Sequence, residues 1–201
     1  MTHALKILLS LLSLLSLLTV ATAAQSATPA QNPAPPPIEA IASLDVPAYM
    51  GTWYQVAWFP NRFQKQCVSD TSATYRQLPG GNVEVLNRCK TADGKFDDVL
   101  GLARPAGSRL DGQTLKPAKL EVSFLPAALR WLPIWGNYWV LSLADDGRYA
   151  VVGESTRQYL WVLSRTPSLS TADETAIRSL LTPLGYELSR WQAHTHSTPA
   201  R

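Results

Sequence analysis

Eight segments of this chain have the composition and spacing of β-strands, and residues that favour turns separate them. In the clearest of these segments, residues 118–124, apolar and polar side chains alternate, as they do in a strand that buries one face. Turn signals such as Pro79-Gly80-Gly81, Ala92-Asp93-Gly94 and Asp145-Asp146-Gly147 lie between segments. Such a series of strands predicts an antiparallel up-and-down meander that closes into an eight-stranded barrel. The predicted strands are 52–59, 69–77, 82–90, 96–104, 118–124, 137–144, 148–154 and 159–165.

A different periodicity begins after the last predicted strand. The run Thr171-Ala172-Asp173-Glu174 predicts a capping box at the start of a helix. Pro183 and Gly185 limit where this helix can end. The predicted fold class is therefore all-β, an eight-stranded barrel with one C-terminal α-helix packed outside it, and a short strand near 186–191 that returns to the sheet. The apolar face of the helix consists of Ile177, Leu180, Leu181 and Leu184.

The first 24 residues have the pattern of a secretory signal peptide. Lys6 precedes the apolar run 7–20, and Ala21-Thr22-Ala23 supplies the small residues of a cleavage site. The apolar run is shorter than the ~20 residues of a membrane-spanning helix, which favours cleavage over a retained anchor. No cysteine lies near the cleavage site, so we expect a periplasmic or secreted protein without an N-terminal lipid.

Composition divides the rest of the chain into three parts. Residues 25–43 are rich in proline and alanine, which predicts a disordered linker. Residues 44–193 are long enough for one domain with a substantial core. Residues 194–201 are polar and unpatterned, and they predict a disordered tail.

Charge and ionisable side chains point neither to a nucleic-acid partner nor to catalysis. The formal net charge is +3 and no basic cluster stands out. His194 and His196 lie in the predicted tail, where their spacing is only a weak metal signal. The pairs Asp97-Asp98 and Asp145-Asp146 lie in or beside turns and have no evident nucleophile beside them. The sequence therefore predicts a protein that is not an enzyme and that needs no metal or cofactor.

The first and last predicted strands carry residues that can form a contact between them. Gly51 and Trp53 open the first strand, and Arg165 ends the last one. An arginine guanidinium can lie on an indole face, a cation–π contact that contributes about 0.5–2 kcal/mol. We therefore predict a clamp made of Gly51, Trp53 and Arg165.

The two cysteines, Cys67 and Cys89, lie near the same rim of the predicted barrel. Cys67 precedes the second strand and Cys89 lies near the end of the third, and a simple hairpin register does not place them opposite each other. A bulge is needed to join them; two unpaired buried thiols are the alternative. An exported protein meets an oxidising compartment, which favours the disulfide.

Several of these features together resemble the lipocalin family, and within it the group of the bacterial lipocalins and apolipoprotein D. The resemblance covers about residues 44–192 and rests on Gly51-Thr52-Trp53-Tyr54, the strand series, the segment 159–167 and the late helix. It implies a barrel with one closed and one open end that binds fatty acids or lysophospholipids, with Trp53 and Arg165 at the closed end. Two departures stand out. Thr156-Arg157-Gln158-Tyr159 replaces the Thr-Asp-Tyr of many lipocalins, and the lipid-bearing cysteine of the bacterial members is absent.

Strand alternation predicts which side chains line the barrel interior and bind the ligand. Period 2 leaves open which of Tyr138 and Trp139 faces inward. We expect storage or transport of a hydrophobic ligand in the cell envelope; a filled barrel that is a scaffold for a protein partner and a lipid-modifying enzyme are the alternatives. The predicted interior positions are Gln55, Ala57, Phe59, Tyr75, Val83, Val85, Leu120, Val122 and Phe124.

The segment 124–137 contains two prolines and a glycine and is predicted to be a long loop at the open rim. It is too apolar for ordinary solvated surface. It either folds inward as a lid over the cavity or docks at a membrane, where tryptophan rings favour the interface and Arg130 meets lipid phosphates. Its candidate residues are Leu129, Arg130, Trp131, Leu132, Ile134 and Trp135.

Overall fold

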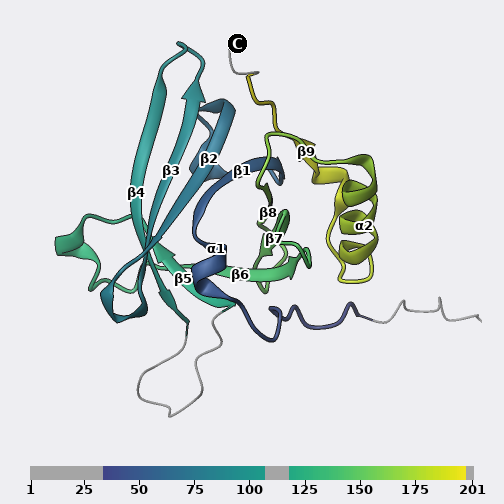
Figure 1. Ribbon diagram of the computed structural model, residues 1–201, viewed down its shortest axis with the longest axis horizontal. Coiled ribbons are helices and arrows are strands. Elements are labelled where there is room, and N and C mark those ends of the chain that lie inside the picture. Colours follow the sequence, from purple (N-terminus) through teal and green to yellow (C-terminus); the bar gives the residue numbers. More distant parts are fainter. Residues whose placement is uncertain (1–33, 107–117, 198–201) are drawn as a thin grey trace, which may run out of the picture. The chain divides into compact units, whose positions relative to one another are not determined.

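Nine strands in the described part of the chain form one antiparallel sheet that closes into a barrel (Figure 1). The structure is a computed structural model and describes residues 34–106 and 118–197. The predicted signal peptide and residues 25–33 of the predicted linker lie outside the described residues. The first and last residues of each predicted strand lie within two residues of those of the corresponding observed strand. The strands are β1 (Gly51–Trp58), β2 (Cys67–Gln77), β3 (Val83–Thr91), β4 (Phe96–Pro105), β5 (Lys119–Ser123), β6 (Gly136–Leu143), β7 (Tyr149–Gly153), β8 (Leu160–Ser164) and β9 (Gln192–Ala193).

The first eight strands pair in sequence order, and β1 closes the barrel by pairing with both β8 and β2. The pairing of β1 with β2 covers only residues 51–54 of β1. Beyond this point β2 is irregular: its pairing with β3 shifts between Ser69 and Ser72, and Asp70 has a φ of 54°. A bulge of this kind bends a strand away from its neighbour.

The C-terminal segment occupies the place that β2 leaves beside β1. Strand β9 pairs with β1, and the His194 N–H donates to the Val56 carbonyl at 2.9 Å. On the other side, the Asp70 N–H donates to the Thr195 carbonyl at 2.9 Å. Residues 194–197 are therefore ordered between β1 and β2, and the prediction of a disordered tail from residue 194 is wrong for them. The predicted return strand forms slightly later, because residues 188–190 make a 3₁₀ turn.

Helix α2 (Thr171–Leu181) packs outside the barrel beside β7 and β8 (Figure 1). Ile177 and Leu181 are fully buried, whereas Leu180 lies at the edge of the apolar face and is exposed. The predicted capping box is displaced by one residue. Ser170 is the N-cap, since its Oγ accepts the Asp173 N–H at 3.1 Å. The Asp173 carboxylate accepts hydrogen bonds from Arg148, at 2.6 Å for the shortest, and this fixes the start of the helix.

Two apolar clusters lie on the two faces of the sheet. One is inside the barrel and is centred on Trp53 and Tyr75 near its closed end. The other lies between the sheet and α2 and includes Phe59 and Ile177. A sheet of alternating side chains produces this division, because successive residues face opposite sides.

The N-terminal part of the described chain packs against the barrel. Ile38 is 4 % exposed and joins the cluster beneath α2, and the Ile41 N–H donates to the Val140 carbonyl at 2.8 Å. The predicted disordered linker is thus ordered from residue 34 to residue 43. A short helix that the sequence analysis did not predict, α1 (Val46–Tyr49), then leads into β1. Within the described ranges, no helix has both the length and the apolar character needed to cross a membrane.

Candidate ligand-binding cavity

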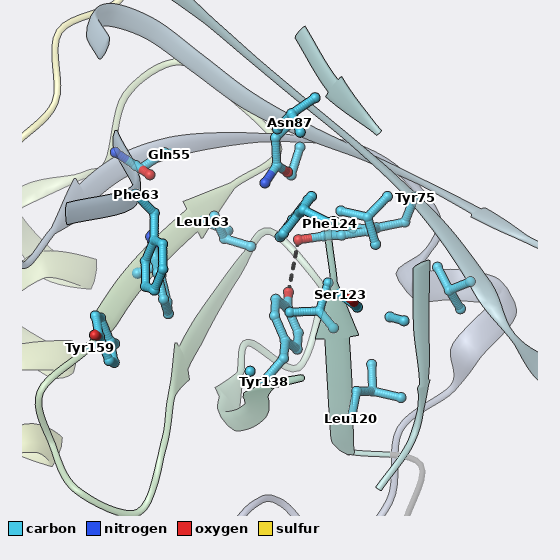
Figure 2. A pocket seen from close by; sticks show the side chains of 18 of the residues that line it. Gln55, Phe63, Tyr75, Asn87, Leu120, Ser123, Phe124, Tyr138, Tyr159 and Leu163 are labelled. Atoms are coloured by element: carbon cyan, nitrogen blue, oxygen red, sulfur yellow. Dashed lines mark hydrogen bonds between the residues drawn. The ribbon is translucent and has the colours of Figure 1, made fainter. Parts of the chain in front are cut away.

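The barrel encloses a cavity with a volume of about 1110 Å³ (Figure 2). It extends from the strand ends near the β2–β3 turn to the loop that follows β5, so it runs along much of the barrel. Most of its wall is apolar. Seven of the predicted interior residues lie in this wall, together with Tyr138 from the pair left open: Gln55, Tyr75, Val83, Val85, Leu120, Val122 and Phe124.

Phe124 reaches the cavity because its neighbouring strand carries a glycine. A Cβ atom at Gly101 would lie 2.6 Å from the Phe124 Cδ1 atom, closer than side chains pack. Gly101 therefore makes room for the Phe124 ring.

Ala57 and Phe59 do not face the cavity, and this part of the sequence prediction is wrong. The β1–β8 register shifts between Gln55 and Ala57, so Val56 is an extra residue in β1. An extra residue moves all later side chains to the opposite face. Ala57 and Phe59 are consequently buried beneath α2 rather than inside the barrel.

The structure resolves the choice between Tyr138 and Trp139. Tyr138 lines the cavity and packs against the interior cluster. Trp139 packs against the outer cluster, and the Lys119 Nζ lies 4.2 Å from its ring centroid. Trp139 was predicted as a ligand-binding candidate and is on the wrong face for that role.

The predicted clamp is present at the closed end. The Arg165 guanidinium lies 3.8 Å from the Trp53 ring centroid, and Trp53 is completely buried. Arg165 also donates to the carbonyls of Thr52 and Ala48, at 3.0 and 2.9 Å. Partial burial lowers the pKa of Arg165 from its ordinary value. Glycine is required at position 51 because the backbone there has a φ of 90°, which residues with a side chain rarely adopt.

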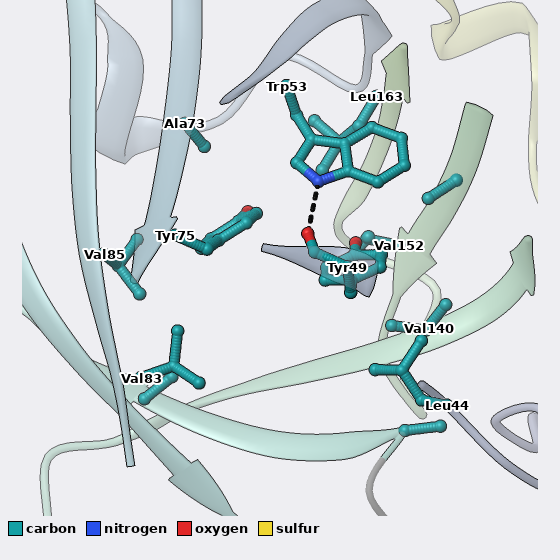
Figure 3. Close-up of a cluster of buried hydrophobic side chains, with 13 residues drawn as sticks. Leu44, Tyr49, Trp53, Ala73, Tyr75, Val83, Val85, Val140, Val152 and Leu163 are labelled. Carbon is teal, nitrogen blue, oxygen red and sulfur yellow. Dashed lines mark hydrogen bonds between the residues drawn. The ribbon is translucent and has the colours of Figure 1, made fainter. Parts of the chain in front are cut away.

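Three tyrosines meet in the cavity next to Trp53, and one of them, Tyr49, was not predicted from the sequence. The Tyr138 hydroxyl lies 2.8 Å from the Tyr49 hydroxyl and 3.0 Å from the Tyr75 hydroxyl. Trp53 is held beside them by its own hydrogen bond, from Nε1 to the Tyr49 carbonyl at 2.8 Å (Figure 3). Burial raises the pKa of Tyr75 to about 12, and burial also raises the pKa of Tyr49 and Tyr138 well above 10.0. All three phenols are therefore neutral hydrogen-bonding groups.

A second polar group in the wall is a relay of amides, which strand alternation alone did not predict. The indole N–H of Trp161 donates to Gln64 Oε1 at 2.9 Å, and Gln64 Nε2 donates to Gln55 Oε1 at 2.8 Å. Because an indole can only donate, this order fixes the orientation of both amides. Gln55 Nε2 is left buried, with no partner among the described residues.

Cys67 and Cys89 form the predicted disulfide in the cavity wall, with their Cα atoms 5.4 Å apart. The pairing of β2 with β3 shifts between Cys67 and Ser69 and again before Ser72. These irregularities supply the bulge that the sequence predicts for a disulfide at this position.

The loop between β5 and β6 leaves several large apolar side chains in solvent. Trp131 is 78 % exposed and Ile134 is 59 % exposed, and Leu129 is exposed as well, whereas Leu132 is half-buried. Trp135 lies under the Arg104 guanidinium, whose Cζ atom is 3.8 Å from the centroid of the Trp135 ring. Both Ile134 and Trp135 border the cavity. Arg130 stabilises the loop by donating to the Leu125 carbonyl at 3.0 Å.

Charged side chains near the cavity are mostly paired. Arg88 forms an ion pair with Asp98 at 2.7 Å, and the Asp97 carboxylate accepts a hydrogen bond from Gln66. The buried Glu154 carboxylate accepts four hydrogen bonds from the backbone and a hydroxyl of the β7–β8 loop. Arg62 lines the cavity, is exposed and has no ion-pair partner among the described residues.

Comparison with known families identifies the fold. A family model described as a lipocalin-like domain matches residues 44–196. The chain is a lipocalin. The matched range ends within the C-terminal segment 194–197, which lies between β1 and β2, so this segment belongs to the lipocalin domain.

Relatives of this lipocalin come from plants, bacteria and animals. Temperature-induced lipocalin-1 of Arabidopsis thaliana is 37 % identical over 81 % of this chain and 82 % of its own length. The outer membrane lipoprotein Blc of Escherichia coli K12 is 31 % identical over 80 % of this chain and 84 % of its own. Mouse apolipoprotein D is 32 % identical over 79 % and 78 %.

Among solved structures, insecticyanin from the tobacco hornworm Manduca sexta is similar to this lipocalin with a TM-score of 0.63 at 20 % identity. The match covers 83 % of this chain and 88 % of that one. Lobster apocrustacyanin A1 gives a TM-score of 0.59 at 16 % identity, covering 77 % and 81 %. These likenesses support the fold. Lipocalins bind small hydrophobic ligands, and the apolar cavity of this chain is suited to such a ligand.

Proposed function

We propose that this lipocalin carries a single-chain lipid, a fatty acid or a lysophospholipid, within its barrel and takes part in lipid maintenance of the cell envelope. The observation that carries this proposal is the cavity itself, with about 1110 Å³ of space behind an apolar wall. Binding cavities for small molecules typically have roughly 300–1,000 Å³. An open interior of this size argues against a filled barrel that is only a scaffold.

The energetics favour an extended apolar chain. Each CH₂ group transferred from water to an apolar wall contributes about 0.8 kcal/mol before the costs of association. A long acyl chain therefore binds by burial alone, without a charged anchor inside the barrel. Its head group can remain at the open rim, in contact with water.

Arg62 is the residue that we assign to the head group. It lies in the β1–β2 loop, lines the cavity and has no ion-pair partner among the described residues. A carboxylate or phosphate at the rim would form a charge-assisted hydrogen bond with its guanidinium. The apolar chain then points inward.

Several observations support an exported protein. The chain contains the Cys67–Cys89 disulfide. Disulfides persist in oxidising compartments and are rare in cytosolic proteins. One relative is named an outer membrane lipoprotein, and the sequence predicts a signal peptide. We propose a periplasmic or secreted location with transient contact between the rim and a membrane.

The first test is native mass spectrometry of the protein purified from cells that export it, which should show a retained lipid. The second is a titration with a fluorescent fatty acid and with its methyl ester. Arg62→Gln should weaken binding of the acid about three- to tenfold and leave the ester within about twofold. Arg76→Gln is the matched control, because Arg76 pairs with Glu84 and does not line the cavity. A protein that retains no lipid and binds neither probe would contradict the carrier function.

A further inference from the structure

The three tyrosines next to Trp53 contain more hydrogen-bond donors than they use. They carry three hydroxyl protons, but only two hydroxyl–hydroxyl contacts connect Tyr49, Tyr138 and Tyr75. Each contact uses one proton. One proton is therefore left without an acceptor among the described residues.

The central position of the Tyr138 hydroxyl, in contact with both of the others, allows it to keep the unused proton. Tyr49 is 3 % exposed and Tyr75 is 7 % exposed, whereas Tyr138 is more exposed and lies between them. A phenol oxygen can accept two hydrogen bonds and donate one. When Tyr49 and Tyr75 both donate to Tyr138, the Tyr138 proton is free to point into the cavity, where Figure 2 shows its ring.

The surroundings determine which kind of oxygen can accept this proton. Apolar side chains such as Val83 and Val85 line the cavity beside the tyrosines. Arg165 lies against the Trp53 ring, and its guanidinium already donates to two carbonyls. A carboxylate buried here would be poorly compensated, but a neutral oxygen would be satisfied by one hydrogen bond.

We propose that Tyr138, supported by Tyr49 and Tyr75, binds a neutral oxygen at the end of the ligand that enters the barrel first. The preferred ligand is then an apolar molecule with a hydroxyl, carbonyl or ester group at the end opposite its head group. This inference rests on the proposed carrier function and adds a second, deep recognition point to it.

The test compares saturated fatty acids with their ω-hydroxy derivatives over a series of chain lengths. Each compound displaces a fluorescent fatty acid from the wild-type protein and from Tyr138→Phe. A buried hydroxyl without a partner weakens binding, so a cavity that lacks the donor disfavours every ω-hydroxy acid. We expect the wild type to bind the ω-hydroxy acids that reach the tyrosines at least as tightly as the unsubstituted acids of equal length.

In Tyr138→Phe, the affinity for these ω-hydroxy acids should fall about tenfold, the effect of one hydrogen bond of about 1.4 kcal/mol. The affinity for the unsubstituted acids should stay within about twofold, because the ring is retained. Tyr49→Phe is the matched control: it leaves the Tyr138–Tyr75 contact in place, and its effect on the ω-hydroxy acids should be smaller.

The possible results separate this inference from the carrier function. If the wild type binds unsubstituted acids and disfavours ω-hydroxy acids of every length, the deep recognition point is wrong while the carrier function stands. An equal loss for both ligand types in Tyr138→Phe would also overturn the inference, because it would reveal only a structural role. If no acid of either type binds, the carrier function itself fails.

Discussion

At the scale of single residues, Arg165 joins the two ends of the barrel sheet at its closed end. It covers Trp53 and donates to the backbone carbonyls of Ala48 in α1 and Thr52 in β1. Its stem and its charge thus both act on the fold, at a point outside the set of side chains that line the cavity. Stability and ligand preference should therefore respond differently when it is removed.

Arg165→Ala should lower the free energy of unfolding by about 1–3 kcal/mol, from the lost cation–π contact and the lost packing of the stem. Urea unfolding measures this change. The control is Arg178→Ala, since Arg178 stacks on the half-buried Trp191 outside the barrel and should have a smaller effect. A variant with wild-type stability but altered lipid preference would show that Arg165 acts in the cavity instead.

His194 ties stability to pH. Its Nε2 accepts the Thr71 N–H at 3.2 Å, which requires the neutral ring. Burial, together with the nearby His196, lowers the pKa of His194 from 6.5 to about 4. Between these two values the unfolded chain binds a proton at this residue and the folded chain does not. Stability must therefore fall as the pH falls from about 6.5 to about 4.

His194→Gln should reduce the fall in the free energy of unfolding between pH 6.5 and pH 4 by about 1 kcal/mol. The effect is no larger because the ring is only partly shielded from solvent. The measurement is urea unfolding at a series of pH values. Asp70, which also faces this site, titrates in a separate and lower range, because its hydrogen bonds with Ser197 outweigh burial and lower its pKa from 3.8. If the free energy of unfolding depends on pH equally in wild type and variant between about pH 4 and pH 6.5, His194 is not the group responsible.

At the scale of elements, the β5–β6 loop is the part of the rim that most resembles a docking surface. Trp131 stands in solvent, while Trp135 is covered by Arg104. An exposed tryptophan favours the boundary between lipid head groups and acyl chains. The same loop borders the cavity, so a lid remains the competing role.

Trp131→Ser should reduce co-sedimentation with anionic phospholipid vesicles about tenfold and leave the affinity for a fluorescent fatty acid unchanged. Leu180→Ser is the control, since Leu180 is exposed on α2 and belongs to a different surface. If sedimentation is intact and fatty-acid affinity falls, the loop is a lid and does not dock.

The disulfide joins β2 and β3 where β2 is irregular and leaves β1. Cys67 and Cys89 are separated by 22 residues, and closing a loop of this size restricts the unfolded chain by about 3 kcal/mol. The double variant Cys67→Ser, Cys89→Ser should lose about this amount in urea unfolding. Reduced wild-type protein should show the same loss. An unchanged free energy in both would mean that the link does not constrain the unfolded chain.

At the scale of the whole molecule, the cavity couples ligand binding to folding. A ligand that binds only the folded barrel, at a free concentration of 100 times its Kd, adds about 2.7 kcal/mol to the free energy of unfolding. For a domain of this size this corresponds to a rise in Tm of about 5–10 °C. A fatty acid should produce this rise in a thermal unfolding experiment. A short-chain acid that cannot fill the cavity should not produce it at the same free concentration. Equal Tm values with both acids would contradict binding in the cavity.

Much of the fold could be predicted from the sequence because its signals are local. Alternation and turn residues set the limits of the eight barrel strands, and the positions of Trp53 and Arg165 at opposite ends of the strand series indicated their contact. Seven cavity residues followed from the same alternation, whereas the choice between Tyr138 and Trp139 did not. These properties depend on each residue and its near neighbours in the chain.

The tertiary structure decided the features that depend on register and on distant contacts. One extra residue at Val56 moved Ala57 and Phe59 to the outer face, and a change of a single residue in register leaves no local trace in the sequence. Residues 194–197 are ordered only because β2 bends away and leaves hydrogen-bonding groups on β1 and β2 to be satisfied. The three tyrosines come from α1, β2 and β6, and only closure of the barrel brings their hydroxyls together.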